Sequence, residues 1–147
     1  MRTPTYRELG EDECRAMLRR NTYGRLAFTD NDRVDVEPLH YVLEGDWLYI
    51  RTSPGTKVAS LRHGPWVAFE VDEVRAPFDW ASVVAKGTVY FIAGVPDPEH
   101  PDEYARAVEI LRRIVPETMT PQDPAPWRTV LLRISVNELQ GRASHPV

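Results

Sequence analysis

Residues 47–73 read WLYIRTSPGTKVASLRHGPWVAFEVDE, and this stretch is the most informative part of the chain about its fold. WLYIRT, residues 47–52, is rich in aromatic and branched side chains, which predicts a strand. A short helix from Thr56 to His63 follows and is closed by Gly64-Pro65. WVAFEV, residues 66–71, then predicts the next strand. The stretch is therefore a strand, a polar turn, a short helix and a strand.

The polar turn has the composition of a phosphate site. Thr52, Ser53 and Thr56 carry hydroxyls that donate hydrogen bonds, and Gly55 lets the backbone approach a ligand closely. Lys57 adds a cation at a helix N-terminus, where free N–H groups favour an anion. The same residues are also ordinary in a solvent-exposed turn, so both interpretations remain open. The turn is not a P-loop, because it lacks the Gly-rich approach to a GK[ST] sequence.

Upstream of this stretch, the sequence predicts one helix and two strands. Residues 11–20 carry Cys14, Met17 and Leu18 at helical spacing, with acids near the start and arginines near the end. GRLAFT, residues 24–29, and VDVEPLHYVL, residues 34–43, flank a polar turn. A second turn, residues 44–46, leads into WLYIRT. Three consecutive strands joined by short turns predict an antiparallel meander.

Downstream, two more strands surround a helix and a loop. WASVVAKGTVYFI, residues 80–92, predicts a long strand. Pro101 can start a helix with Tyr104, Val108, Leu111 and Val115 on one face, which Pro116 would end. Residues 116–127 are proline-rich and predict a loop, and RTVLLRISV, residues 128–136, supplies a last strand.

These elements predict a mainly β fold with flanking helices (α+β), in which six antiparallel strands form a small closed barrel. Closure removes exposed sheet edges. An OB-like barrel, a lipocalin-like cup and a flavin split barrel all satisfy the pattern, so the choice among them depends on site residues.

Composition limits the classes of partner. The chain of 147 residues has 18 basic and 22 acidic side chains, a formal charge of −4, and no net positive field to attract nucleic acid. We expect one domain over residues 1–147. The polar N-terminus and the absence of a long apolar run argue against secretion and membrane insertion. Cys14 is the only cysteine, which suits a reducing compartment, and we expect a cytoplasmic protein.

The segment Val36-Glu37-Pro38-Leu39-His40-Tyr41 contains a second candidate site. Proline cannot donate to a strand ladder, so Pro38 indicates an edge, a bulge or space beside the backbone for a flat ligand. Alternation places Pro38 and His40 on the face of Val34 and Val36, with Leu39 opposite. His40 is a candidate catalytic residue, although a core histidine bonded to a backbone carbonyl explains the same pattern.

A third candidate site opens the long strand, in the sequence DWASVVAKG at residues 79–87. Trp80 and Ser82 share one strand face and offer an aromatic wall and a hydrogen bond to a ring system. Core or interface packing of Trp80 is the simpler alternative.

The order of these segments resembles the pyridoxamine 5'-phosphate oxidase-like FMN-binding family. The similarity runs from Glu13 to about Ile92, through ECRAMLRRNTYGRLAF, VEPLHYV, the stretch at 47–73 and DWASVVAKGTVYF. Within the family, the chain is most similar to the branch related to nitroimidazole-resistance proteins. The strand ending in TS-P-G-T-K, followed by a short helix and a strand ending in FEVDE, is the most specific part.

The resemblance implies a six-stranded split barrel that forms a homodimer, with FMN held at the subunit interface. Thr52, Ser53, Thr56 and Lys57 would then bind the FMN phosphate and ribityl chain. The remaining predicted contacts are Pro38, Leu39 and His40 along the isoalloxazine ring, and Trp80, Ser82 and Val83 closing the pocket.

The C-terminus departs from authentic pyridoxamine phosphate oxidases. It reads NELQGRASH at residues 137–145, without the family's tryptophan and with compressed spacing, which argues against vitamin B6 oxidation. Arg142 and His145 are interpreted as solvated tail residues.

The sequence therefore leads to the hypothesis of a flavin-dependent oxidoreductase acting on a small planar substrate. His40 would be its proton donor or substrate anchor. The alternatives are a non-enzymatic FMN-binding or sensing module, or a barrel that holds a deazaflavin coenzyme or haem.

Overall fold

A computed structural model describes residues 3–94 and 98–147, and this part of the chain forms nine strands and three helices. All strand pairings are antiparallel. In chain order the elements are β1 (Thr5–Leu9), α1 (Glu11–Arg20), β2 (Tyr23–Asp30), β3 (Arg33–His40), β4 (Val42–Glu44), β5 (Trp47–Thr52), α2 (Thr56–His63), β6 (Trp66–Ala76), β7 (Asp79–Ile92), α3 (Glu103–Leu111), β8 (Val130–Ser135) and β9 (Glu138–His145).

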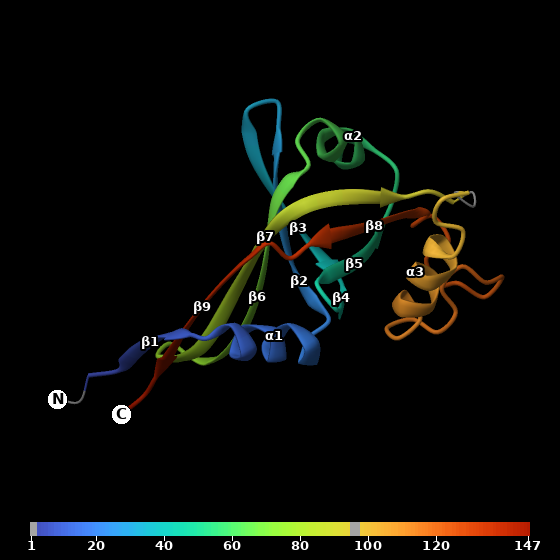
Figure 1. Cartoon of the computed structure of the whole chain (residues 1–147). Helices are drawn as coiled ribbons and strands as arrows, with labels where there is room; N and C mark the ends of the chain where they lie inside the picture. Colours follow the sequence, from blue (N-terminus) through green and yellow to red (C-terminus); the bar gives the residue numbers. More distant parts are fainter. Residues whose placement is uncertain (1–2, 95–97) are drawn as a thin grey trace.

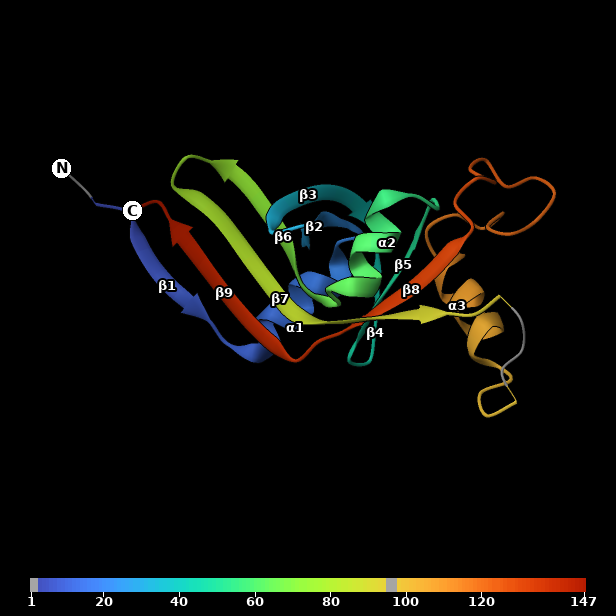
Figure 2. The same cartoon turned by 90° about the horizontal axis from the view of Figure 1, so that it is seen from above.

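The strands form a split barrel around β7 (Figures 1 and 2). The spatial order is β3-β2-β6-β7-β8-β5-β4, while β9 also pairs with β7 and carries β1 on its other side. The first half of β7 pairs with β6 and β9, and the last residues, from Val89 to Ile92, pair with β8. One long strand therefore belongs to both halves of the barrel.

Gly87 lies where β7 passes from one half to the other. A Cβ atom at this position would lie 1.5 Å from the backbone oxygen of Ser135, so the site has no room for a side chain. Asn137 donates its backbone N–H to the carbonyl of Lys86 nearby. The connection from β8 to β9 therefore crosses β7 at its glycine.

The main core fills the inner side of the barrel and is closed by α1. Cys14, Met17 and Leu18 of α1 are buried, as the helical spacing predicted. The buried hydroxyl of Tyr41 donates to the carbonyl of Leu18 at 2.7 Å, which satisfies one carbonyl of the last helical turn. Burial raises the pKa of Tyr41 well above its usual range. A second apolar cluster lies beneath α3 and includes Val108.

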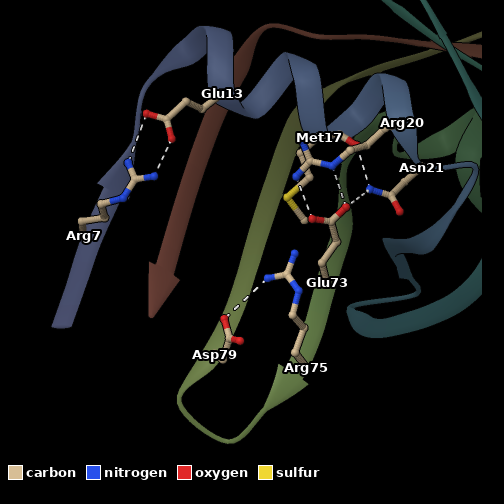
Figure 3. Close-up of polar contacts among 8 residues, drawn as sticks. All are labelled: Arg7, Glu13, Met17, Arg20, Asn21, Glu73, Arg75 and Asp79. Atoms are coloured by element: carbon tan, nitrogen blue, oxygen red, sulfur yellow. Dashed lines mark hydrogen bonds and ion pairs between the residues drawn. The ribbon is translucent and has the colours of Figure 1, made fainter. Parts of the chain in front are cut away.

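Ion pairs fix α1 at both ends (Figure 3). Arg7 of β1 forms two hydrogen bonds to Glu13, at 3.1 and 2.7 Å. At the other end, Glu73 of β6 accepts two hydrogen bonds from Arg20, at 2.8 and 2.7 Å, and one from Asn21 at 2.8 Å. These donors lower the pKa of Glu73 to about 2.

The six-stranded prediction was wrong in number, although the mainly β class and the flanking helices are as expected. β1 and β9 were not predicted, because β1 is mostly exposed and the buried positions of β9 are the small residues Gly141, Ala143 and Ser144, which give no apolar alternation in the sequence. The predicted strand at 34–43 divides into β3 and β4 at Tyr41, whose N–H bonds to the carbonyl of Thr22. The meander is therefore broken at this residue, since β3 pairs with β2 and β4 pairs with β5.

The helix predicted between Pro101 and Pro116 is shorter than expected at both ends. It runs from Glu103 to Leu111, after which tight turns replace the last predicted turn of helix. The proline-rich residues 116–127 form turns, as expected. No helix in the described ranges, 3–94 and 98–147, is long and apolar enough to span a membrane.

Candidate functional site

The predicted phosphate clasp, residues 52–57, lies between the end of β5 and the first turn of α2. Thr52 is the last residue of β5 and is buried, whereas Thr56 is exposed at the start of the helix. Gly55 has a φ of 151°, a conformation that side chains rarely permit, and no atom lies within 4 Å of its missing Cβ. The helix has no side-chain cap and no acid in its first turn. Its N–H groups and the surrounding hydroxyls therefore suit an anion.

Lys57 is held by a carboxylate that the sequence did not identify. Its ammonium lies 2.5 Å from Glu37 Oε2, and its side chain is 13% exposed. Glu37 comes from the face of β3 opposite Pro38, where it reaches α2. The contact holds the lysine in place at the clasp, but any anion bound there must compete with Glu37.

His40 ends β3 and is exposed. Its Nδ1 lies 3.2 Å from the carbonyl of Thr22, and its ring centroid is 4.9 Å from that of Tyr23. Since a carbonyl only accepts, Nδ1 carries the proton and Nε2 is the other available nitrogen. The carbonyl bond agrees with the alternative to catalysis, but His40 is exposed and is not the core histidine which that alternative described.

His40 also lines a cavity of about 210 Å³ at the end of α3. Arg51 and Arg128 bring cationic side chains to this cavity, and Leu111 and Val115 supply apolar walls. The histidine is therefore both hydrogen-bonded and adjacent to space for a small molecule.

A buried ion pair next to the clasp was missed from the sequence. Arg51 forms two hydrogen bonds to Asp123, at 2.7 and 2.8 Å, and the two side chains are 9% and 2% exposed. Asp123 also accepts the backbone N–H groups of Met119 and Ala125. These donors, Arg51 first, hold the pKa of Asp123 well below its usual range. The ion pair therefore fastens the 118–128 loop over β5, beside His40.

The third predicted site lies on a different surface, the face of β3, β2, β6 and β7 that points away from the core. We call it the outer face; by strand register it carries Val34, Val36, Pro38, Arg25, Glu70, Ser82 and Trp80. Ser82 donates to Glu70 at 3.1 Å. Val83 points the other way and is fully buried in the core, so its side chain does not reach the outer face.

An arginine connects the candidate sites on the outer face. Arg25 is the register partner of Pro38 and lies 3.3 Å from both Glu70 and Asp72. Burial and the adjacent Asp72 raise the pKa of Glu70. Pro38 and Ser82 are thus linked across the sheet through Arg25 and Glu70.

The clasp and the Trp80 site remain separate within one chain. Leu39 packs against the core from β3, near the clasp, and Trp80 contacts Tyr6 of β1 at 6.4 Å between ring centroids. Throughout the described residues, no hydrogen bond, ion pair or ring contact joins Thr52, Ser53, Thr56 or Lys57 to Trp80 or Ser82.

The strand order, the shared β7 and the clasp at α2 define a split β-barrel protein. The family model described as pyridoxamine 5'-phosphate oxidase matches residues 10–143, and the chain belongs to this family.

Individual relatives agree with this assignment. An FAD-binding protein from Mesorhizobium loti has 27% identity and a TM-score of 0.78, covering 98% of this chain and 100% of that one. A candidate 5-nitroimidazole antibiotic resistance protein from Bacteroides thetaiotaomicron has the same fold, with a TM-score of 0.71 at 17% identity over 97% of this chain and 90% of that one. An uncharacterized protein from Rhizobium meliloti (strain 1021) is 24% identical over 139 residues, 95% of this chain and 85% of its own length.

Proposed function

We propose that this protein is a flavin-dependent oxidoreductase that binds FMN through the clasp at α2. The clasp is the observation that carries the proposal. It combines hydroxyls of Thr52, Ser53 and Thr56 with an uncapped helix N-terminus and Lys57. The FAD-binding relative from Mesorhizobium loti supports a flavin as the ligand.

The residues of the clasp fit a phosphomonoester. A phosphate carries up to two negative charges, against one on Glu37, and it accepts several hydrogen bonds at once. The free space at Gly55 leaves the backbone accessible to such a group. A bound phosphate would replace Glu37 as the principal partner of Lys57.

We further propose a homodimer formed through the outer face, with the flavin between the subunits. The outer face exposes apolar side chains that include Val34 at 76% and Val36 at 55% exposure. Contiguous exposed apolar area is typical of interaction sites. We propose that in this dimer Trp80 and Ser82 of one protomer complete the flavin site at the clasp of the other. This arrangement explains why the two sites are separate within one chain.

A bound flavin would supply the two-electron chemistry, while the protein binds and orients the reactants. Because its Nδ1 proton is donated to Thr22, His40 can offer Nε2 to a substrate in the adjacent cavity. We assign His40 as the proton donor, which requires the imidazolium form with a proton on Nε2, or as the substrate anchor for a small planar substrate. Full turnover by His40→Ala, at unchanged flavin content, would remove this role.

The choice of FMN over FAD is tested by releasing the flavin with heat and separating it by chromatography. The clasp as built from one lysine and three hydroxyls favours a terminal phosphate. FMN as the released compound supports the proposal. FAD would move the assignment to the cofactor of the Mesorhizobium loti relative.

A non-enzymatic flavin-binding module is the second candidate. It is favoured by the hydrogen bond and ring contact of His40, which give this residue a structural role. The two functions differ in one measurement, the reoxidation of the reduced flavin by 4-nitrobenzoate without dioxygen. Reoxidation that accelerates with substrate concentration supports the oxidoreductase, and a rate independent of substrate supports the module.

A further inference from the structure

A cavity at the N-terminal end of α3 is lined by two polar groups that find no hydrogen-bond partner in the described chain. Its volume is about 360 Å³, and its lining includes Tyr49 of β5, Arg133 of β8 and Asp102 at the start of α3. None of the described residues that line it comes from β3, β2, β6 or β7, so the cavity lies outside the outer face. Figures 1 and 2 show α3 at the end of the molecule opposite β1 and the two termini.

Tyr49 provides the first of these groups. It packs in the apolar cluster beneath α3 and is only 5% exposed, yet its hydroxyl makes no hydrogen bond to any residue in the ranges 3–94 and 98–147. The hydroxyl of the buried Tyr41, in contrast, donates to a carbonyl. A buried hydroxyl without a partner costs free energy, so such groups ordinarily meet a water molecule or a ligand. A cavity of this size holds much more than one water molecule.

Arg133 provides the second group, and it is the register partner of Tyr49. Its guanidinium lies over the ring of Trp47, 3.9 Å from the centroid, and Nη2 lies 3.3 Å from a carboxylate oxygen of Glu103. These contacts fix the guanidinium, but Nε is buried without a partner among the described residues. A guanidinium has five N–H donors, so Arg133 keeps donors for a further acceptor. A phenol and a guanidinium side by side favour a carboxylate.

Asp102 adds an uncompensated negative charge to the same cavity. It stands directly before α3, but its carboxylate neither caps the helix nor forms an ion pair in the part of the chain that the structure describes. The arginines of the lining already have acidic partners, since Arg133 is paired as above and Arg106 lies 3.7 Å from Glu44. The cavity thus offers donors for an anion and a free carboxylate for a cation. A ligand with both charges satisfies the two sides together.

We propose that this cavity binds a small zwitterion, an α-amino acid, with its carboxylate on the donors of Tyr49 and Arg133 and its ammonium toward Asp102. The site is separate from the clasp at α2. It also lies at the opposite end of α3 from the cavity of His40, whose wall includes Leu111. The inference therefore goes beyond the proposed function and needs no bound flavin.

The test is calorimetric titration of the purified full-length protein with L-serine and two analogues of similar size. Serinamide has a neutral amide in place of the carboxylate, and glycerate has a hydroxyl in place of the ammonium. The titrations are made at about pH 6, below the pKa of an α-amino group. We expect L-serine to bind at least about tenfold more tightly than either analogue, because each analogue loses charge-assisted hydrogen bonds.

Two substitutions assign the two ends of the ligand. Tyr49→Phe should weaken L-serine binding about tenfold by removing a donor to the carboxylate. Asp102→Asn should weaken the binding of L-serine but not that of glycerate, which has no ammonium. Asp12→Asn, at an exposed acid in the first turn of α1, is the matched control and should leave all three affinities unchanged.

Thermal unfolding separates a ligand site from a structural one. Because the hydroxyl of Tyr49 has no partner among the described residues, Tyr49→Phe without ligand should keep or raise the melting temperature. Tyr41→Phe should lower the melting temperature and keep L-serine binding. Equal affinities for L-serine and its analogues, or an unchanged affinity in Tyr49→Phe, would overturn the proposal. A melting temperature that falls as much in Tyr49→Phe as in Tyr41→Phe would also overturn it, since the hydroxyl would then have a structural partner.

Discussion

Glu73→Gln should destabilise the protein at neutral pH and lose its effect in acid. Glu73 ties the end of α1 to β6 through Arg20 and Asn21 (Figure 3). A fall in its pKa from 4.5 to about 2 corresponds to about 3 kcal/mol of folding free energy by linkage. The Arg20 side chain is 55% exposed, so solvent screening reduces the expected loss to about 1.5 kcal/mol.

The sign of the pH dependence follows from the lowered pKa. A carboxylate with a folded-state pKa below its unfolded value stabilises the fold above the unfolded pKa, and this stabilisation is lost as pH falls toward the folded value. The urea unfolding midpoints of the wild type and of Glu73→Gln should therefore differ at pH 7 and converge as the pH falls from about 4.5 to about 2. Glu13→Gln, which removes a half-exposed pair on the same helix, is the control and should change little. A Glu73→Gln difference that is equal at both pH limits would refute the reasoning.

Three further changes probe the fold. Gly87→Ala should lower the free energy of unfolding by about 3 kcal/mol or more, because its Cβ meets the Ser135 backbone oxygen. A melting temperature within a degree or two of wild type, measured by circular dichroism, would contradict the close crossing of the β8–β9 connection over β7 at this glycine. Tyr41→Phe should cost about 1–2 kcal/mol in urea unfolding by removing its buried hydrogen bond, and no loss would show that Leu18 needs no donor. Asp123→Asn should cost about 3–5 kcal/mol and speed hydrogen exchange in the 118–128 loop; unchanged exchange would mean that the ion pair does not hold the loop.

The sequence predicted the helices and strands whose own residues show a helical or strand-like spacing of apolar side chains. α1 follows from Cys14, Met17 and Leu18 at helical spacing, and its observed limits match the prediction. β1 and β9 carry no such pattern, because they are stabilised by partners far away in the sequence: β1 pairs with β9, and β9 also pairs with β7. The break at Tyr41 likewise depends on a distant partner, the carbonyl of Thr22. Apart from His40, apolar residues continue from Leu39 to Leu43 and give no sign of the break.

In the candidate site, too, the sequence predicted what is contiguous and missed what depends on distant residues. Residues 52–57 are contiguous, so turn chemistry and the helix start placed them together without knowledge of the fold. The carboxylate on Lys57 and the partner of Arg51 lie 20 and 72 residues away, which no local pattern reveals. Val83 was expected from the family resemblance to help close the pocket, but strand alternation turns its side chain into the core. Arg142 was interpreted as a solvated tail residue, because its place between β1 and β7 exists only once β9 is paired.

A visible absorption spectrum of the purified protein tests whether the clasp at α2 holds a flavin phosphate. Lys57→Ala is compared with Lys86→Ala, a change at the only other lysine in the chain. We expect flavin bands in the wild type and in Lys86→Ala, and their loss in Lys57→Ala while the circular dichroism stays native. A colourless wild type that also fails to take up added FMN or FAD, or full flavin content in Lys57→Ala, would rule out a flavin phosphate at this clasp.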